Sequence, residues 1–287
     1  MITPIEQVTY YIEQHLDDDL NIVQLARVAG YSHFHFCRIF KLHTGESVKS
    51  YMIRLKLERA ATEMTYDDKS IITIAQDAGY QTPTGFLKAF KARFGTTPSS
   101  YKSSSKQLLQ HYKEWVMKRP EIVTRQEVSV VFMRERGNYM SSSEIAWRRL
   151  SEKMNTLNEL FAKNPPSIEM HLGKGKAEAL GICHDDPNVT NEENIRYDAA
   201  LAWGEAEVKE LAKYGFDTKT VAGGMYAMVM YKGDEAVAEQ AWYGLYAWIE
   251  QSSYSFRDVP AFEKYLNGFE ETDPLKIDTE VYVPISL

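Results

Sequence analysis

The feature that most constrains this chain is a pattern that occurs twice within its first hundred residues. Ile22-x-x-Leu-Ala-x-x-Ala-Gly-Tyr31 returns as Ile71-x-x-Ile-Ala-x-x-Ala-Gly-Tyr80, at a shift of 49 positions. Each copy continues with a Phe, a basic residue, Phe-Lys, Gly and Tyr, which are Phe36, Arg38, Phe40, Lys41, Gly45 and Tyr51, and then Phe86, Lys88, Phe90, Lys91, Gly95 and Tyr101. The repeat predicts two helix-turn-helix units, the motif that lays a helix in a DNA groove.

Length and charge favour two domains of different character. The chain has 287 residues, more than the usual size of about 100 to 200 residues per domain. Up to residue 105 it holds 12 Lys+Arg and 11 Asp+Glu, which leaves 21 and 29 of the totals of 33 and 40 for the rest. A near-neutral part of charge +1 therefore precedes an acidic part of charge −8, and the net charge of −7 argues against indiscriminate nucleic-acid binding.

Cysteine content and apolar runs indicate where such a chain works. Cys37 and Cys183 fall one in each predicted domain, which argues against a disulfide framework and fits a reducing compartment. The first residues lack a basic stretch followed by an apolar one, and no run approaches the roughly 18 apolar residues of a membrane span. We expect a cytoplasmic protein without membrane contact. No Cys or carboxylate lies at ligand spacing beside the histidines of the first part, so no metal or cofactor is expected.

Apolar spacing, caps and glycines in residues 1–101 predict an all-α domain of seven helices. The fourth helix, which opens at Ser47 and runs to about Met64, is expected to join the two helix-turn-helix units rigidly. The last helix starts at Thr97-Pro98 and is expected to end near Tyr101.

The second copy also carries a longer signature. Tyr80 is followed by Phe86, Lys88, Phe90, Phe94-Gly95 and Thr97-Pro98-Ser-Ser-Tyr101. This resembles the signature of the AraC/XylS family of transcription regulators, over about the first 105 residues. The resemblance implies seven helices with two helix-turn-helix units joined by a long helix.

Geometry selects the residues of the first unit that would meet DNA. The N-terminal part of a recognition helix enters the major groove, which makes its outward positions candidates: His33, Phe34, Cys37 and Arg38. The guanidinium fork of Arg38 matches guanine O6 and N7, a pair worth roughly 1 to 3 kcal/mol of discrimination. A phosphate-contacting or structural arginine is the alternative. Phe34 is either a contact to thymine methyl groups or a core aromatic, and Cys37 is expected to contribute weakly.

The second unit offers less chemistry for reading bases. Its outward candidates are Thr84, Gly85, Lys88 and Lys91, but Gly85 has no side chain and Pro83 has no free donor. We therefore expect asymmetric recognition, in which the first unit reads bases and the second contacts phosphates. Because both readers lie in one chain, they can occupy two major-groove segments about 34 Å apart without a dimer.

Residues 106–121 read as a polar linker, and the character of the sequence changes beyond it. Expected strands and helices alternate, with helices at 145–160, 236–249 and 262–266. Gly137 and Gly233 follow similar β-rich runs, lie 96 positions apart and each precede a helix with Trp. This predicts an α+β domain of two pseudo-repeated strand-helix-strand-strand units with a central cleft.

Aromatic residues gather in this acidic half and suggest what the cleft would bind. Aromatic faces with a carboxylate favour a lipophilic cation, at roughly 0.5 to 2 kcal/mol per contact. Glu263 is the carboxylate, because it stands between Phe262 and Tyr265. The expected ligand-binding aromatics are Trp147, Tyr197, Tyr226, Trp242, Tyr246, Phe262 and Tyr265. Core packing of these aromatics and a solvated Glu263 are the alternatives.

The same half resembles the GyrI-like effector-binding domain, in motifs that follow the order of that family from about residue 122. These are Ile195-Arg-Tyr-Asp198, Gly223-Gly224-Met-Tyr-Ala, the Trp-rich run 242–249, Pro260-Ala-Phe-Glu263-Lys-Tyr265 and Glu280-Val-Tyr-Val-Pro-Ile285. The resemblance implies that Glu263 is the pocket carboxylate and that aromatic residues form the walls. The expected domains are 1–105, which binds DNA, and 122–287, which binds the effector.

Together these patterns predict a transcription regulator, with promoter DNA, a small aromatic or cationic effector and RNA polymerase as partners. Activation is expected, and repression stays open. The rival hypothesis is an enzyme in which Glu263 with Tyr197 or Tyr265 hydrolyses a small substrate. No Gly-x-Ser-x-Gly, metal-ligand pair or nucleotide loop supports it. A protein-interaction module is the third alternative for the second domain.

Overall fold

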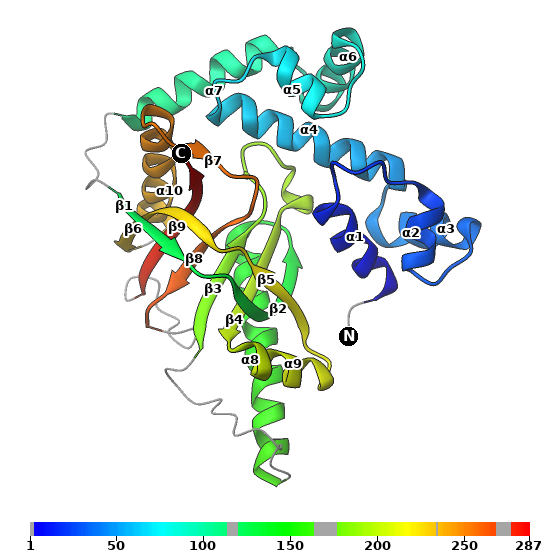
Figure 1. Cartoon of the computed structure of the whole chain (residues 1–287), viewed down its shortest axis with the longest axis vertical. Coiled ribbons are helices and arrows are strands. Elements are labelled where there is room, and N and C mark those ends of the chain that lie inside the picture. Colours follow the sequence, from blue (N-terminus) through cyan, green and yellow to red (C-terminus); the bar gives the residue numbers. More distant parts are fainter. Residues whose placement is uncertain (1–2, 114–119, 164–176, 234, 268–276) are drawn as a thin grey trace. The chain divides into compact units, whose positions relative to one another are not determined.

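The computed structural model describes residues 3–113, 120–163, 177–233, 235–267 and 277–287. The chain divides into two compact units, Met1–Gln107 and Leu108–Leu287 (Figure 1). The first is helical, and the second is a curled antiparallel sheet with helices, which confirms the two-domain organisation of a helical part followed by an α+β part. In the described part of the chain, no helix combines the length and the apolar character that a membrane crossing requires.

Seven helices build the first unit, as predicted. They are α1 (Pro4–Gln14), α2 (Ile22–Val28), α3 (His33–Thr44), α4 (Val48–Tyr66), α5 (Ile71–Asp77), α6 (Pro83–Phe94) and α7 (Pro98–Lys113). Thr3 and Asn21 cap α1 and α2 through capping boxes, in which side chain and backbone satisfy each other's free donors. Gly45 and Gly95 end α3 and α6 in the left-handed region, at φ 79° and 72°, which favours glycine.

The repeated aromatic residues of this unit form its cores. Phe36 and Phe40 of α3 are fully buried, and so are their counterparts Phe86 and Phe90 of α6. The ring of Tyr51 meets Phe40 edge-on at 5.4 Å, which ties α4 to α3. The repeated phenylalanines are therefore structural, whereas Arg38 and Lys88, which differ between the copies, are exposed.

The last helix is longer than predicted. α7 continues to Lys113, past the expected end near Tyr101 and through the serine run 103–105. The hydroxyl of Ser104 donates to the carbonyls of Ser100 and Tyr101, at 3.1 and 3.0 Å. Lys106 pairs with Asp68, a residue distant in the sequence. Serine in a helix can return its hydroxyl to the preceding turn, so a serine run alone does not end one.

Among its described residues, the second unit is built on one nine-stranded sheet. Its strand order is β1-β6-β9-β8-β3-β4-β2-β5, with β7 paired to β9 at the side. The strands are β1 (Glu121–Arg125), β2 (Val128–Arg136), β3 (Glu178–Cys183), β4 (Arg196–Trp203), β5 (Asp217–Val221), β6 (Gly224–Lys232), β7 (Ser255–Phe256), β8 (Ala261–Tyr265) and β9 (Asp278–Ser286). The helices are α8 (Tyr139–Lys163), the short η1 (Glu192–Asn194), α9 (Glu205–Lys213) and α10 (Glu235–Gln251). All pairings are antiparallel, and β3 with β8 forms the central pair.

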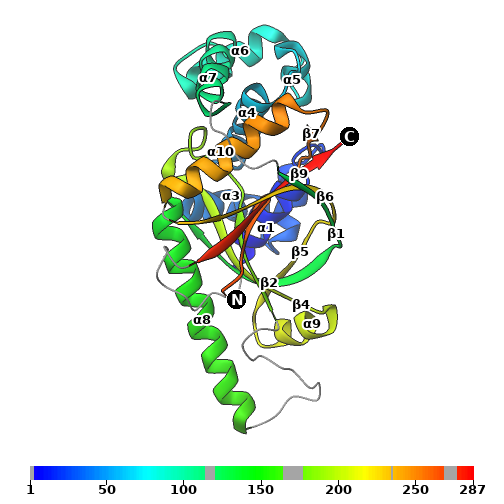
Figure 2. The ribbon, with the colours of Figure 1, turned by 90° about the vertical axis from the view of Figure 1, so that its left-hand side faces the viewer.

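α8 and α10, the two longest helices in the described part of this unit, pack against the sheet (Figure 2), and their contacts place them on either side of the central pair. α8 packs on β2 and β4 through a core that includes Leu150 and Leu201, and α10 packs on β6 and β9 through Leu245 and Val281. Register and strand alternation place both cores on one face, which we call the helix face. A single cross-sheet row runs through Ala199, Gly181, Glu263 and Val281 on this face.

One predicted helix was wrong. Residues 262–266 were expected to be helical, but Ala261–Tyr265 is strand β8 in the middle of the sheet. The segment pairs with β3 on one side and β9 on the other, and these partners lie far away in the sequence. A five-residue run has too few apolar positions to distinguish the two periods, so tertiary pairing decides its conformation.

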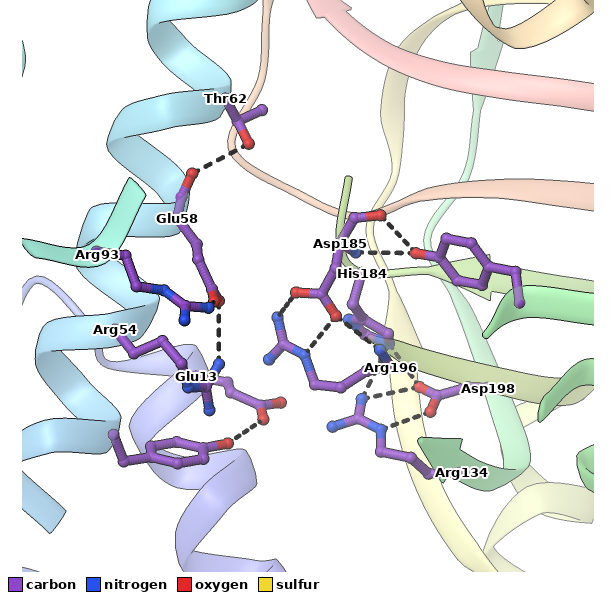
Figure 3. A network of polar contacts seen from close by, with 12 residues as sticks. Glu13, Arg54, Glu58, Thr62, Arg93, Arg134, His184, Asp185, Arg196 and Asp198 are labelled. Carbon is purple, nitrogen blue, oxygen red and sulfur yellow. Dashed lines mark hydrogen bonds and ion pairs between the residues drawn. The ribbon is translucent and has the colours of Figure 1, made fainter. Parts of the chain in front are cut away.

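The opposite face of the sheet holds a buried ionic cluster (Figure 3). Asp198, which is fully buried, accepts a hydrogen bond from Arg134 Nε at 2.6 Å, lies 2.7 Å from His184 Nε2 and pairs with Lys219. Burial alone would raise the pKa of Asp198, but the charges of Arg134 and Lys219 outweigh it and hold the pKa well below its usual range. Burial lowers the pKa of His184 to about 4, against the opposing attraction of Asp198.

This histidine predicts a pH dependence of stability. Between its usual pKa of about 6.5 and its folded pKa of about 4, the unfolded chain binds a proton that the folded chain does not. Unfolding is therefore favoured as pH falls. We expect the free energy of unfolding to decrease by about 1 to 2 kcal/mol between pH 7 and pH 5. Asp198 loses its own contribution only below this window. All five tryptophans follow residue 107, so denaturant unfolding monitored by tryptophan fluorescence reports the second unit.

His184→Gln provides the comparison, because glutamine keeps a donor for Asp198 but does not titrate. We expect this variant to lose clearly less stability than the natural chain between the two pH values. Equal losses in both proteins would show that His184 is not the responsible group.

Candidate functional site

The outer surface of α3 carries the predicted DNA-reading residues. His33, Phe34 and Arg38 are exposed, and the Phe34 side chain is 81% exposed, which excludes the alternative of a core aromatic. Cys37 is half-buried and packs against the core of the first helix-turn-helix unit. Ser32 stands at the N-cap of α3, but its hydroxyl makes no capping bond. Three of the four candidates are therefore exposed in the first half of this helix.

The corresponding surface of α6 differs in chemistry. Thr84, Lys88 and Lys91 are exposed, whereas Gly85 is half-buried. The backbone N–H of Gly85 donates to Thr82 Oγ1 at 3.2 Å, so this glycine belongs to the helix cap. What α6 presents outward at these positions is one hydroxyl and two ammonium groups, without a fork-shaped donor like that of Arg38.

In the second unit, Glu263 lies at the centre of the helix face. Its Oε1 accepts from Tyr231 Oη at 3.0 Å and from Trp242 Nε1 at 2.9 Å, and its Oε2 accepts from Tyr265 Oη at 2.7 Å. The donors come from β6, α10 and β8, so the contact forms only when the sheet and α10 are assembled. Glu263 is half-buried, which corrects the alternative of a fully solvated carboxylate.

The hydrogen bonds continue from Glu263 towards α8. Tyr265 Oη lies 3.0 Å from Tyr197 Oη, and Trp147 Nε1 donates to Tyr197 Oη at 2.8 Å. An indole can only donate and a carboxylate only accepts, so the chain must run from Trp147 through Tyr197 and Tyr265 to Glu263. Burial, with the nearby carboxylate adding to it, raises the pKa of Tyr265 well above its ordinary value. The hydroxyl therefore stays protonated and available as a donor.

All three donors to Glu263 are neutral. Within the described residues, no Lys, Arg or His side chain forms an ion pair with this carboxylate. Trp242 also contacts Tyr246, with ring centroids 5.9 Å apart. The structure thus brings together Glu263 and five of the seven aromatic residues predicted from sequence: Trp147, Tyr197, Trp242, Tyr246 and Tyr265.

The other two predicted aromatics, Tyr226 and Phe262, lie elsewhere. Strand alternation directs Phe262 to the face opposite its neighbour Glu263, and Tyr226 lies beside it with ring centroids 5.4 Å apart. The guanidinium of Arg125 lies 5.4 Å from the Phe262 ring, and that of Arg257 lies 5.3 Å from the Tyr226 ring. Both rings are buried, and each already contacts an arginine of the chain. The prediction that these two residues lie beside Glu263 was therefore wrong.

Sequence reasoning missed two residues of this site. Tyr231 supplies a hydroxyl to Glu263, and Gly181 pairs with Glu263 across the central strands. A Cβ on Gly181 would stand 2.5 Å from Tyr265 Oη and closer still to Tyr197 Oη, so glycine makes room for the paired hydroxyls. The sequence showed Tyr231 as an aromatic residue at the end of a β-rich run. Its contact with Glu263 could not be predicted, because that contact depends on the register of the strands.

These features define a class of protein: a double helix-turn-helix unit joined to a sheet domain with an aromatic carboxylate site. Comparison with known families gives the same division. The family described as a helix-turn-helix domain matches residues 25–104, and the GyrI-like small molecule binding domain matches residues 118–286. The chain belongs to the AraC-type DNA-binding transcription regulators that carry a GyrI-like domain.

Two curated proteins and one solved structure are among those similar to this chain. Regulatory protein SoxS of Escherichia coli is 33% identical over 98 residues, 34% of this chain and 92% of that protein. The right origin-binding protein of Escherichia coli is 25% identical over 235 residues, 80% of this chain and 78% of that protein. A hydrolase encoded by lin2189 from Listeria innocua is 14% identical in sequence, with a TM-score of 0.43, over 65% of this chain and 98% of that one.

The packing above Gly181 generates a prediction. Gly181→Ala places a methyl group where the hydroxyls of Tyr197 and Tyr265 meet, and we expect a destabilisation of about 1 to 3 kcal/mol in fluorescence-monitored unfolding. In a background with Tyr197→Phe and Tyr265→Phe, where both hydroxyls are absent, the same alanine should cost less. Equal costs in both backgrounds would mean that the hydroxyl pair does not constrain this position.

Proposed function

We propose that α3 reads DNA bases and that α6 holds the second groove mainly through phosphates. Arg38 carries this proposal, because it is an exposed guanidinium in the first half of α3 that forms no ion pair with any residue the structure describes. Exposed Phe34 adds an apolar surface for thymine methyl groups, and His33 adds a hydrogen-bonding edge. Lys88 and Lys91 of α6 supply point charges, which suit phosphates better than base edges.

A single chain is sufficient for this mode of binding, since both readers belong to one compact unit. The two helices would occupy successive major-groove segments, about one helical turn of DNA apart. We propose that the regulator acts at promoters together with RNA polymerase.

We further propose that the second unit binds a small aromatic cation at Glu263. The supporting observation is a carboxylate that receives three neutral donors and, among the described residues, forms no ion pair. A cation bound there would be attracted by the negative charge of Glu263. Trp147 of α8 and Trp242 of α10 would supply aromatic surfaces to contact it. A small polar ligand would bind weakly to a site formed by so many aromatic rings.

The topology supports a binding site between the two halves of the sheet. β2-α8-β3-β4 and β6-α10-β8-β9 have the same order of elements, apart from the short η1 in the first and the short β7 in the second, and they meet at the β3–β8 pair. We propose that they are pseudo-repeats and that a cleft lies over this junction, where Gly181 contributes no side chain. A hydrolase or a protein-interaction module would use the same surface differently, and both are outcomes of the experiments below.

We expect Arg38→Ala and Lys88→Ala to impair DNA binding in different ways. Duplexes enriched from random DNA by the full chain provide the probe. Arg38→Ala should relax preference at one base position, at a cost of about 1 to 3 kcal/mol for the preferred base. Lys88→Ala should weaken all duplexes alike and reduce the salt dependence by about one phosphate contact.

Lys209→Ala, an exposed charge of the second unit, is the matched control and should leave binding unchanged. The asymmetric proposal would be wrong if Lys88→Ala altered base preference while Arg38→Ala weakened all sequences equally. Failure to enrich any sequence would remove the DNA-reading proposal itself.

For the effector, tetraphenylphosphonium and the neutral triphenylphosphine oxide make a matched pair of probes. The cation should quench tryptophan fluorescence saturably, and Glu263→Gln should weaken its binding by on the order of tenfold to a hundredfold. The neutral probe should bind weakly and respond little to this change. Glu280→Gln is the control, because Glu280 also accepts from a tyrosine hydroxyl, at 2.6 Å from Tyr282, but on the opposite face.

Equal binding of both probes would contradict a role for the carboxylate charge. Turnover of a test ester that depends on Glu263, without saturable quenching by the cation, would favour the hydrolase instead. If the second unit showed neither ester turnover nor saturable quenching but bound a protein partner, the interaction module would be favoured.

A further inference from the structure

Helix α4 carries a pair of charged residues whose burial the DNA-reading surfaces do not explain. Arg54 and Glu58 lie one turn apart in the helix, and they are only 8% and 5% exposed. Charged side chains of this kind are buried in proteins when they are paired. Their partners come from both helix-turn-helix units of the first compact unit.

Arg54 is tied to the first helix-turn-helix unit. Its Nε donates to Glu46 Oε1 at 2.8 Å, in the turn between α3 and α4. Its guanidinium lies 4.9 Å from the centre of the Tyr51 ring, and the Tyr51 hydroxyl donates to Glu13 Oε1 of α1 at 2.9 Å. Arg54 Nη1 then donates to Glu58 Oε2 at 3.0 Å.

The other oxygen of Glu58 is bound by the second helix-turn-helix unit. Arg93, in the last turn of α6, donates from Nη2 to Glu58 Oε1 at 2.5 Å. Glu58 therefore holds Arg54 with one oxygen and Arg93 with the other (Figure 3). The chain from Glu46 through Arg54 and Glu58 to Arg93 links the end of the first recognition helix to the end of the second.

A second contact from α4 has the same character. The guanidinium of Arg59 pairs with both carboxylate oxygens of Asp17, in the segment after α1. The same group reaches the carbonyl oxygen of Asp77, at the end of α5, at 3.5 Å. The hydrogen bond from Arg59, reinforced by its charge, lowers the pKa of Asp17 against the opposing effect of burial. α4 thus connects both halves at two neighbouring positions.

Stability alone accounts poorly for the buried trio of Arg54, Glu58 and Arg93. Two of its N–H groups, Arg54 Nη2 and Arg93 Nε, are buried without an acceptor among the described residues. A buried ion pair roughly breaks even against apolar packing, and unsatisfied donors add a cost. Fixing the register of packed elements is the best-attested use of such buried charges.

We propose that Glu58 is a positioning residue that sets the distance and angle between the two recognition helices. With Arg54 and Arg93 it keeps α3 and α6 in register with two successive segments of the major groove. The inference rests on the proposed reading of two grooves by one chain. Its consequence is that the protein discriminates the spacing between the two DNA segments as well as their sequence.

The test uses the full chain and a duplex that it enriches from random DNA, with the two contacted segments mapped by hydroxyl-radical footprinting. One or two base pairs are then inserted between these segments. The natural chain should lose about tenfold or more in affinity on insertion, because one reader must be released. Arg93→Met, which keeps an apolar stem but removes the ion pair, should bind the original duplex more weakly and lose less than about threefold on insertion.

Glu58→Gln keeps the shape of the side chain and should behave in the same way, which provides a second variant if Arg93→Met fails to fold in thermal melts. Asp18→Ala removes an exposed contact with His15 inside the first half, and it should retain the full penalty for insertion. A merely structural role for the trio would lower stability without altering the insertion penalty.

The inference is overturned if a folded Arg93→Met or Glu58→Gln variant shows the same insertion penalty as the natural chain. A footprint of the natural chain that covers one segment only would overturn the two-groove proposal, and the inference with it. Two protected segments with an unchanged penalty in both variants would leave two-groove binding intact and reject the role of Glu58 alone.

Discussion

The pairing of β3 with β8 is the interaction on which the second unit depends. It joins β2-β4-β3 to β6-β9-β8, and it sets Gly181 directly opposite Glu263. Because α8 and α10 cover the strands on either side, the central pair is where side chains from both halves converge. The hydrogen-bonded chain from Trp147 to Glu263 crosses this junction. A one-residue slip in this register would direct Glu263 to the other face and dismantle the site.

The two faces of the sheet surround their carboxylates with different partners. Asp198 is surrounded by Arg134, Lys219 and His184, so its charge is satisfied within the chain. Glu263 receives only tyrosine and tryptophan donors among the described residues, and these stabilise a carboxylate without neutralising it. The aromatic rings follow the same division, since arginines lie over the rings opposite the helix face. Asp198 is therefore paired with cations of the chain, whereas Glu263, among the described residues, is not.

The helical unit shows a comparable separation between what is repeated and what is not. Phe36 and Phe40 match Phe86 and Phe90 because each pair fills an equivalent core. One exposed position differs in chemistry, with the guanidinium of Arg38 in one copy and the ammonium of Lys88 in the other. Glu58 of α4 belongs to neither copy of the repeat, yet it contacts both halves through Arg54 and Arg93. The repeat accounts for the two helix-turn-helix units, and we propose that α4 keeps their recognition helices in register.

The sequence alone determined the seven helices, the change to an α+β domain and the family, because the Ala-Gly-Tyr repeat and its caps are local signals of high specificity. It also placed Glu263 among five of its aromatic neighbours. Tertiary structure alone decided that 261–265 is a strand, that Phe262 and Tyr226 face away from Glu263, and that Gly181 and Tyr231 complete the site. Each of these depends on strand register, and register is set by partners distant in the sequence, which no local pattern specifies.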